Sequence, residues 1–266
     1  MRFGEFEIVQ PIAKGGMASV YEARRGTERV ALKVLDPAFA GTPELVEQLF
    51  AELDIARRVR HPGVLKIHGA GRASDGAPFL VMELLRGETV ADLAERGALG
   101  LDDIAAIGAG AAAALAAMHA AGVVHCDVKH DNLVLCGARV KVIDFGVARL
   151  VGTALDVDTI SGTPWCMAPE QWRGRPVPAS DVYALGCVLY ELTTGNPPFD
   201  GSLPALMTAH FDQRPARPSW LRPMPMALER LIVRALAKAP ADRPTMGELA
   251  VALSTLADAT DLAQAA

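Results

Sequence analysis

Short apolar runs separated by glycine and polar residues fill the first third of the chain. The runs are rich in β-branched residues, and runs of this length and composition favour strands over helices. The sequence predicts five strands before residue 84, at 7–12, 20–23, 30–34, 64–69 and 78–83. The first three follow one another closely enough to form consecutive antiparallel strands.

One stretch inside this strand-rich part has a helical period. Apolar residues recur every three or four positions from Leu45 to Val59, which is the spacing of one helix face. Thr42, Pro43 and Glu44 precede them and supply an N-cap, a proline at the first helical position and an acid in the first turn. We predict a helix of about 15 residues that ends near Arg60.

Helical spacing dominates after residue 88. The predicted helices are 89–96, 101–121, 180–194, 203–211, 226–237 and 245–256, and the alanine-rich tail 249–266 continues the last one. Two short apolar runs, 133–135 and 140–143, predict a small hairpin between the helices. We therefore expect an α+β fold with a β-rich part (1–83), a hinge (84–88) and a mostly helical part (89–266).

The length of the chain allows a large core, and its net charge argues against a nucleic-acid-binding protein. A chain of 266 residues is long enough for a large core. Its formal net charge of −5 argues against nucleic acid as a partner, because nucleic-acid-binding surfaces normally carry a basic excess. We expect no nucleic-acid function.

The cysteines and the apolar segments indicate the compartment. The four cysteines, at 126, 136, 166 and 187, contain no C-x-x-C pair, so reduced thiols in a cytoplasmic protein are the simplest interpretation. The N-terminus has no signal-peptide run, and stretch 104–124 is rich in alanine rather than leucine and phenylalanine. We expect that stretch to be a buried helix and the chain to have no membrane segment.

The most specific chemical pattern is H-C-D-V-K-H-D-N at 125–132, followed by Asp144, Phe145 and Gly146. A carboxylate can accept a proton from an alcohol, a lysine can neutralise a transferring phosphate, and an asparagine and a second aspartate can hold Mg²⁺. These residues are Asp127, Lys129, Asn132 and Asp144. The spacing is hard to obtain by chance, so the pattern predicts phosphoryl transfer.

Two weaker patterns lie in the β-rich part. Gly15 and Gly16 separate two predicted strands, where backbone amides could cover phosphates, although a glycine pair there is more often only a hairpin turn. Lys33 ends the V-A-L-K strand and Glu52 lies on the following helix. Alone, each is more often a solvated surface charge than a functional group; together they match a lysine and glutamate that form an ion pair beside nucleotide phosphates.

With these motifs together, the chain resembles the eukaryotic-like protein kinases, particularly bacterial serine/threonine kinases, over nearly all its length. The resemblance implies a bilobal kinase fold. It implies that Asp127 deprotonates a serine or threonine hydroxyl of a protein substrate and that Lys129 contacts the γ-phosphate of ATP. Asn132 and Asp144 would bind Mg²⁺, with Mn²⁺ as an alternative, and Phe145 and Gly146 would have regulatory packing roles.

The A-P-E pattern at 168–170 strengthens this resemblance, because it closes the activation segment of protein kinases and is typically absent from small-molecule kinases. Thr163, with Lys129, resembles the serine/threonine kinases. The resemblance pairs Glu170 with Arg243 as a buried ion pair; a surface position is the alternative for Arg243. Asp181 resembles the helix-start aspartate that anchors the catalytic loop, and a plain helix cap is compatible with that role.

The resemblance also implies an adenine site between the two lobes, with Met82 as gatekeeper. Apolar residues at these positions would equally suit an ordinary core. The expected contacts are Val20, Ala31, Val134 and the backbones of Glu83 and Leu85.

The chain departs from the kinase patterns at several positions. Ala13 and Ala18 replace two glycines of the glycine-rich loop, and Cys126 stands where the arginine of His-Arg-Asp is usual. That arginine commonly binds a phosphorylated activation-segment residue. We therefore expect activity that does not depend on phosphorylation of Thr159, Ser161 or another residue of that loop.

The leading hypothesis is an ATP- and Mg²⁺-dependent serine/threonine protein kinase. A nucleotide-binding pseudokinase or scaffold is the first alternative, favoured by the altered loop and by Cys126. A small-molecule kinase is the second alternative. The sequence leaves the oligomeric state and the physiological substrate open.

Overall fold

The computed structural model describes residues 2–74, 76–97, 99–153 and 162–264. The chain forms two compact units that interleave in sequence. Unit 1 comprises Met1–Arg60, Val64–Arg86 and Asp144–Gly146, and unit 2 comprises His61–Gly63, Gly87–Ile143 and Val147–Ala266. Thr159 and Ser161 lie outside the described residues.

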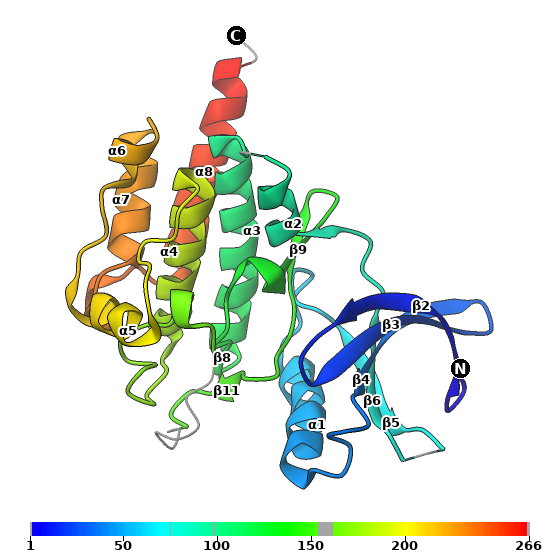
Figure 1. Ribbon diagram of the computed structural model, residues 1–266. Helices are drawn as coiled ribbons and strands as arrows, with labels where there is room; N and C mark the ends of the chain where they lie inside the picture. The colour runs from blue at the N-terminus through cyan, green and yellow to red at the C-terminus, as the bar shows by residue number, and fades with distance from the viewer. Residues whose placement is uncertain (1, 75, 98, 154–161, 265–266) are drawn as a thin grey trace. The chain divides into compact units, whose positions relative to one another are not determined.

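Unit 1 is an antiparallel sheet with one long helix. The strands lie in the order β1-β2-β3-β4-β6-β5 (Figure 1). Their bounds are β1 Arg2–Phe3, β2 Phe6–Lys14, β3 Ala18–Arg25, β4 Glu28–Leu35, β5 Ile67–Arg72 and β6 Pro78–Glu83. Phenylalanine, valine and leucine side chains from these strands form one core cluster. β4 is central, with β3 and β6 on either side, so Lys33 is held by ladders on both edges.

Helix α1 (Pro43–Arg58) begins as predicted, with proline in its first turn and Glu44 beside it. It ends at Arg58 because the next residue, Val59, has extended backbone angles. The predicted strand 64–69 was shifted: β5 starts at Ile67. Val64 and Leu65 are buried, as their apolar character requires, but they lie outside the ladder.

Unit 2 is built on helices, with α3, α4 and α8 packed against one another (Figure 1). The helix bounds are α2 Val90–Glu95, α3 Leu101–Ala120, α4 Pro178–Thr194, α5 Leu203–Asp212, α6 Pro218–Leu221, α7 Met226–Ala235 and α8 Met246–Gln264. At Gly108 of α3, a Cβ atom would lie 2.8 Å from Leu189 Cδ2 of α4. A side chain at position 108 would therefore have to displace the end of the Leu189 side chain.

Short strands and 3₁₀ turns of unit 2 shape its loops. The strands are β7 Glu88–Thr89, β8 Val123–Val124, β9 Leu133–Cys136, β10 Arg139–Val142 and β11 Arg149–Leu150. The 3₁₀ turns are η1 His130–Asn132, η3 Pro164–Cys166 and η4 Pro240–Asp242. β9 and β10 form the expected hairpin, and β7 extends it. The two-residue strands were not predicted, because two residues show no periodicity.

Helix α3 is long and apolar enough to span a membrane by length and composition alone. Nine of its residues are buried, and it packs against α4, α8 and β10. These contacts make α3 a core helix of unit 2.

Candidate active site

The loop between β8 and β9 gathers polar side chains around Asp127. Lys129 Nζ lies 2.9 Å from Asp127 Oδ2. Asn132 Nδ2 donates to the same oxygen at 3.0 Å and to the Asp127 carbonyl at 2.8 Å. These bonds use the Asn132 amide nitrogen, so its side-chain oxygen is oriented away from Asp127 and can serve as a ligand.

Thr163, 36 residues beyond Asp127, completes this cluster. Its hydroxyl donates to Asp127 Oδ1 at 2.7 Å and accepts from Lys129 Nζ at 3.1 Å. Thr163 thus bridges the carboxylate and the ammonium group. The arrangement fixes the Asp127 carboxylate by a hydrogen bond to each oxygen, which is how proteins orient a general base.

His125 is fully buried and orders the backbone of the loop. Its Nδ1 accepts from the Asp127 backbone N–H at 3.2 Å, and its Nε2 lies 3.0 Å from the Ile143 carbonyl. One ring nitrogen therefore accepts and the other donates, which assigns the Nε2–H tautomer. Ile143 also donates its N–H to the Asn132 carbonyl at 3.0 Å. His125 is a core residue that links the loop to the end of β10.

Asp181, in the first turn of α4, anchors the same loop. Its Oδ2 accepts from the His125 N–H at 2.8 Å and its Oδ1 from the Cys126 N–H at 2.9 Å. His119 Nε2 adds a third bond at 2.8 Å. Burial alone would raise the pKa of Asp181, but the hydrogen bonds from His119 and from the loop outweigh burial and lower it. An ionised buried carboxylate thus holds the loop.

Cys126 contributes its backbone, not its side chain, to this arrangement. Its φ angle is +66°, and burial raises the pKa of its thiol well above the ordinary value. The Cys126 Sγ points to the Val124 carbonyl at 3.7 Å, and Gln171 Nε2 donates to the Cys126 carbonyl at 2.6 Å. A buried neutral thiol offers no cation to a phosphorylated loop residue.

Glu170 and Arg243 form a fully satisfied buried ion pair. Arg243 Nη1 lies 2.6 Å from Glu170 Oε1, and Nη2 lies 3.0 Å from Oε2. Ser180 Oγ adds a bond to Oε1 at 2.6 Å. The remaining guanidinium donors reach the carbonyls of Ala179, Ala237 and Lys238. This pair ties the A-P-E segment to α4 and to the turn before α8.

Unit 1 contains a second charged cluster around Lys33. Its Nζ donates to Glu52 Oε1 at 2.7 Å, to Glu52 Oε2 at 3.0 Å and to Asp144 Oδ1 at 2.7 Å. Lys33 comes from β4 and Glu52 from the buried face of α1. The structure therefore brings together two residues that the sequence separates by 19 positions and a third that is 111 positions away.

Lys33 is shared by the carboxylates of Glu52 and Asp144, and the more deeply buried carboxylate, Glu52, is hard to ionise. Burial raises the pKa of Glu52 to about 7; Lys33 lowers it in part, and the charge of Asp144 raises it again. Burial also lowers the pKa of Lys33, but the two carboxylates outweigh that effect and raise it overall. Lys33 therefore stays charged, while Glu52 is poised to take up a proton near neutral pH.

The Asp-Phe-Gly residues belong to unit 1. Asp144 has a φ angle of +63°, and it and Cys126 are the two non-glycine residues with positive φ in the described part of the chain. Such a conformation costs roughly 1–2 kcal/mol and is typical of functional sites. Phe145 is buried, and the Gly146 carbonyl accepts from Gln48 Nε2 of α1 at 2.6 Å.

The expected nucleotide-binding residues are distributed over both units. Gly15 and Gly16 lie in the turn between β2 and β3, where the Gly15 N–H bonds the Ala18 carbonyl at 2.9 Å. The apolar members divide between the units: Val20, Ala31 and Met82 on sheet strands of unit 1, and Val134 on β9 of unit 2. Glu83 ends β6 with its N–H bonded to the Lys66 carbonyl, and Leu85 follows in unit 1.

The donor set suits Mg²⁺ rather than a transition metal. The described residues contain no group of three or more histidine, cysteine, aspartate or glutamate side chains able to hold a metal by themselves. Mg²⁺ is usually bound through one or two carboxylate or amide oxygens together with phosphates and water. Asn132 of unit 2 and Asp144 of unit 1 each carry a side-chain oxygen of this kind.

Comparison with known proteins identifies the family. A model of the protein kinase domain matches residues 6–252. The chain belongs to the protein kinase family. This kinase is 35% identical over 263 residues to the serine/threonine-protein kinase pkn3 of Myxococcus xanthus, covering 92% of this chain and 48% of that protein. It is 36% identical over 260 residues to PknE of Mycobacterium tuberculosis, covering 94% and 46%. The kinase chain thus spans about half the length of these curated relatives.

A solved structure confirms the expected fold. The crystal structure of a point mutant of the PknI kinase domain of Mycobacterium tuberculosis superposes with a TM-score of 0.74 at 29% identity, over 96% of each chain. The α+β kinase fold expected from the sequence is therefore confirmed.

Three residues that support the kinase loops were missed by sequence reasoning. They are His119, Gln171 and Gln48. A histidine at the end of an alanine-rich helix was a signal that could have been noticed. Gln171 and Gln48 gave none, because a glutamine has the same appearance in sequence whether it faces water or a buried carbonyl.

Proposed function

We propose that the chain transfers the γ-phosphoryl group of ATP to serine or threonine hydroxyls of proteins. The observation that carries this proposal is the hydrogen-bonded cluster of Asp127, Lys129, Thr163 and Asn132 in a chain of the protein kinase family. The names of the relatives support the serine/threonine specificity.

In this mechanism, Asp127 orients the acceptor hydroxyl and takes its proton. Its carboxylate is held by Asn132 on one oxygen and by Thr163 on the other, so its orientation is set before the acceptor binds. Lys129, whose side chain is 28% exposed and lies beside the carboxylate, would contact a phosphate near the acceptor. The Thr163 bridge couples these two groups.

Asn132 and Asp144 would hold Mg²⁺, which supplies charge neutralisation for the phosphates. Lys33 would contact phosphate oxygens, and Glu52 would fix the Lys33 ammonium by the two bonds at 2.7 and 3.0 Å. Four free cysteines support a cytoplasmic location for this activity. The rest of ATP would be bound by Gly15, Gly16, Val20, Ala31, Met82, Glu83, Leu85 and Val134.

A transfer assay tests the proposal. Purified protein is incubated with labelled ATP and Mg²⁺, alone and with a general protein substrate, beside Asp127→Asn and Lys33→Met variants. Label on serine or threonine that disappears in both variants supports the proposal. Binding of ATP without transfer would instead support a pseudokinase or scaffold, and label on a small molecule would support a small-molecule kinase.

The proposed regulation rests on Cys126. Its thiol is buried and uncharged, so the loop lacks the arginine that commonly reads a phosphorylated activation segment. We infer that transfer does not depend on phosphorylation of Thr159, Ser161 or Thr153. Phosphatase treatment and a Thr159→Ala/Ser161→Ala variant should leave the rate within about threefold of wild type. A loss of transfer with intact ATP binding would contradict this inference.

A further inference from the structure

Residues 213–234 of unit 2 are rich in positive charge. This segment contains five arginines and a single acid, Glu229, whereas the whole chain has a net charge of −5. The segment runs from the end of α5 through α6 and α7. Side chains of this segment make none of the contacts described above for the kinase loops or for the two ionic clusters.

Helix α6 presents bulky apolar side chains to solvent from a rigid turn. Trp220 is 75% exposed and Leu221 is 51% exposed. Prolines at 215, 218, 223 and 225 bracket the turn, and each fixes its own φ angle. Trp220 therefore stands at a preorganised site, and its exposure is a property of the fold.

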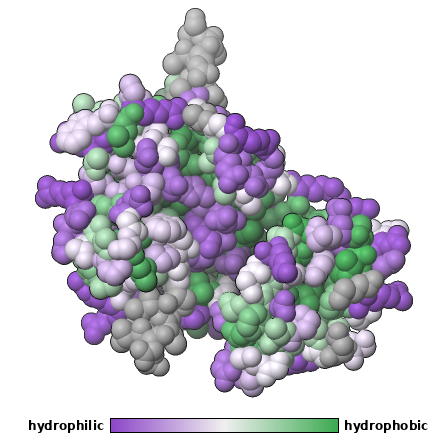
Figure 2. Space-filling model, in the orientation of Figure 1, coloured by the Kyte–Doolittle hydropathy of each residue, from purple (hydrophilic) through white to green (hydrophobic). Residues whose placement is uncertain are grey.

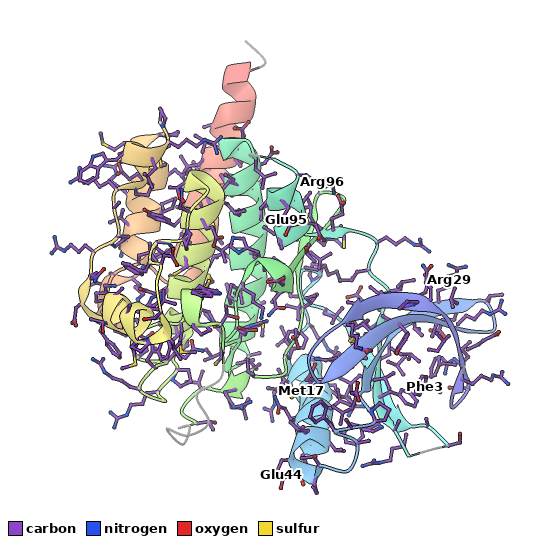
Figure 3. All side chains as sticks on the ribbon, viewed as in Figure 1. Phe3, Met17, Arg29, Glu44, Glu95 and Arg96 are labelled. Carbon is purple, nitrogen blue, oxygen red and sulfur yellow. The ribbon has the colours of Figure 1, made fainter. Side chains whose placement is uncertain are left out.

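Helix α7 extends this surface. Its buried stripe is Leu228, Ile232 and Ala235. Glu229, the only acid of the segment, accepts from Ser219 Oγ at 2.9 Å and so ties α7 to α6. Figure 3 shows long side chains projecting outward from both helices. The exposed stripe of α7 carries Met226, Arg230, Val233 and Arg234.

Three arginines of the segment have no carboxylate partner. Among the described residues, no ion pair involves Arg214, Arg217 or Arg230. The other two arginines of the segment are engaged. Arg222 is turned inward to the carbonyls of Leu99 and Thr193, and Arg234 donates to the Asp242 carbonyl and helps to lower the pKa of Glu248.

The sheet of unit 1 shows the contrast. There, Arg24, Arg25 and Arg29 are also exposed, and each pairs with a glutamate. Unlike these three arginines, Arg214, Arg217 and Arg230 are exposed with no carboxylate partner among the described residues. We name Arg214, Arg217, Trp220, Met226 and Arg230 the arginine–tryptophan surface.

We propose that the arginine–tryptophan surface docks on an anionic lipid bilayer. Exposed tryptophan and methionine can enter the headgroup region, while arginines keep their charge at the lipid phosphates. Each basic side chain near such a surface strengthens binding about fivefold. Three arginines without carboxylate partners and an exposed tryptophan thus suffice for reversible binding without a membrane-spanning segment.

The exposed tryptophan and methionine beside the arginines favour a bilayer over an acidic peptide, because a bilayer interface takes up apolar side chains as well as cations. A peptide needs a groove that receives its side chains. In Figure 2, hydrophobic and hydrophilic residues are interspersed over the end of unit 2 that carries α6. Such a mixed outer surface matches the bilayer interface, where apolar and anionic groups alternate over a few ångströms.

Sedimentation with vesicles tests this proposal. The full chain should bind phosphatidylcholine vesicles that contain about one third phosphatidylglycerol, and should lose at least about tenfold in affinity on pure phosphatidylcholine or in high salt. Arg214→Glu/Arg217→Glu/Arg230→Glu should weaken binding by about a hundredfold or more. The matched variant Arg57→Glu/Arg58→Glu/Arg60→Glu, which makes the same charge change on exposed residues at and just beyond the end of α1, should stay within about threefold.

Tryptophan changes test the apolar part. Trp220→Ser should weaken vesicle binding by about tenfold, whereas Val251→Ser, at a site 69% exposed on α8, should not. Trp220→Phe should still bind but lose the blue shift of tryptophan fluorescence that the wild type shows on vesicles. Thermal melts of every variant verify folding without reference to catalysis.

Three outcomes would overturn the proposal. They are equal binding to neutral and anionic vesicles, equal loss in the two triple variants, and tight binding to soluble polyglutamate or DNA with none to vesicles. A failure of the transfer assay would leave this proposal standing, because docking uses none of the catalytic residues.

Discussion

The two buried ionic clusters of this kinase differ in how completely their charges are matched. Around Glu170, every carboxylate oxygen is paired, and Arg243 places its donors on one carboxylate and three carbonyls. Around Lys33, a single ammonium serves two carboxylates, one of which, Asp144, is 45% exposed at its side chain. We call the first cluster closed, because its charges pair one to one, and the second open, because Lys33 is shared between two carboxylates.

This difference in charge pairing indicates a structural role for the Glu170–Arg243 cluster and a chemical role for the cluster around Lys33. A closed ion pair gains nothing from a new ligand and is costly to break, because the partner left behind is buried and charged. An open cluster can exchange its contacts with phosphates and a divalent cation at small cost. Charge matching, more than burial, thus distinguishes what holds the kinase together from what we propose binds ATP.

The largest effect is expected from breaking the closed pair. Arg243→Met leaves Glu170 buried without a cation and should lower the free energy of unfolding by about 3–5 kcal/mol. Urea denaturation measures this loss. Arg24→Met, which breaks the exposed pair with Glu7, is the control and should cost less than about 1 kcal/mol. Equal losses in the two variants would refute the distinction between closed and surface pairs.

Breaking the open cluster should affect catalysis instead. Lys33→Met should lower the rate of phosphoryl transfer by about a hundredfold or more, because it removes a charge that we place on the phosphates. Its stability loss should be much smaller than that of Arg243→Met, since Glu52 can take up a proton near neutral pH.

Arg60→Met, an exposed cation just after α1, is the matched control for both readouts. It should leave the rate and the denaturation midpoint near wild type. If Lys33→Met instead unfolded the protein as much as Arg243→Met does, the open cluster would be structural after all.

The open cluster should also make the stability of the protein depend on pH, through Glu52. The pKa of Glu52 rises from 4.5 to about 7 on folding, so the folded state holds a proton that the unfolded state releases between those pH values. Stability from Glu52 is therefore full below the unfolded pKa and is lost as pH rises through the folded pKa. Between pH 4.5 and 7, Glu52→Gln should abolish a fall of about 3 kcal/mol in the free energy of unfolding, measured as the difference from wild type. Glu44→Gln, exposed at the start of α1, should keep the wild-type slope.

The smallest effect is expected at Cys126. Its sulfur is directed to the Val124 carbonyl at 3.7 Å, and its part in the site is played by its backbone N–H and carbonyl. Cys126→Ser should therefore change the transfer rate by less than about threefold. Steady-state kinetics on a protein substrate check this, and a loss above about tenfold would assign the thiol a direct part in the reaction.

Much of the fold was predictable because its signals are local. The α1 start, the β6 strand and the α3 start coincide with the predicted positions, since proline, acid and apolar spacing act within one or two turns. The displaced β5 strand shows the limit of such reasoning. Val64 and Leu65 are apolar and buried, but pairing with β6 decides which residues join the ladder.

The candidate site divides in the same way. Lys33, Glu52, Asp127 and Asn132 were predicted as site residues from motif spacing and from the resemblance to protein kinases, whose phosphoryl transfer uses such groups. The sequence did not show which atoms these side chains contact. The left-handed backbone of Cys126 and the bond from Gln171 to its carbonyl depend on residues 45 positions apart.

By itself, then, the amino-acid order determined the family, the chemical groups and most of the helices and strands. Only the tertiary structure decided that the Glu170–Arg243 cluster is closed and that the cluster around Lys33 is open. It also decided that Trp220 is exposed and that nearby arginines have no carboxylate partner among the described residues. The physical reason is that ion pairing and solvent exposure depend on contacts between residues that are far apart in the sequence. Those contacts form only when the whole chain packs.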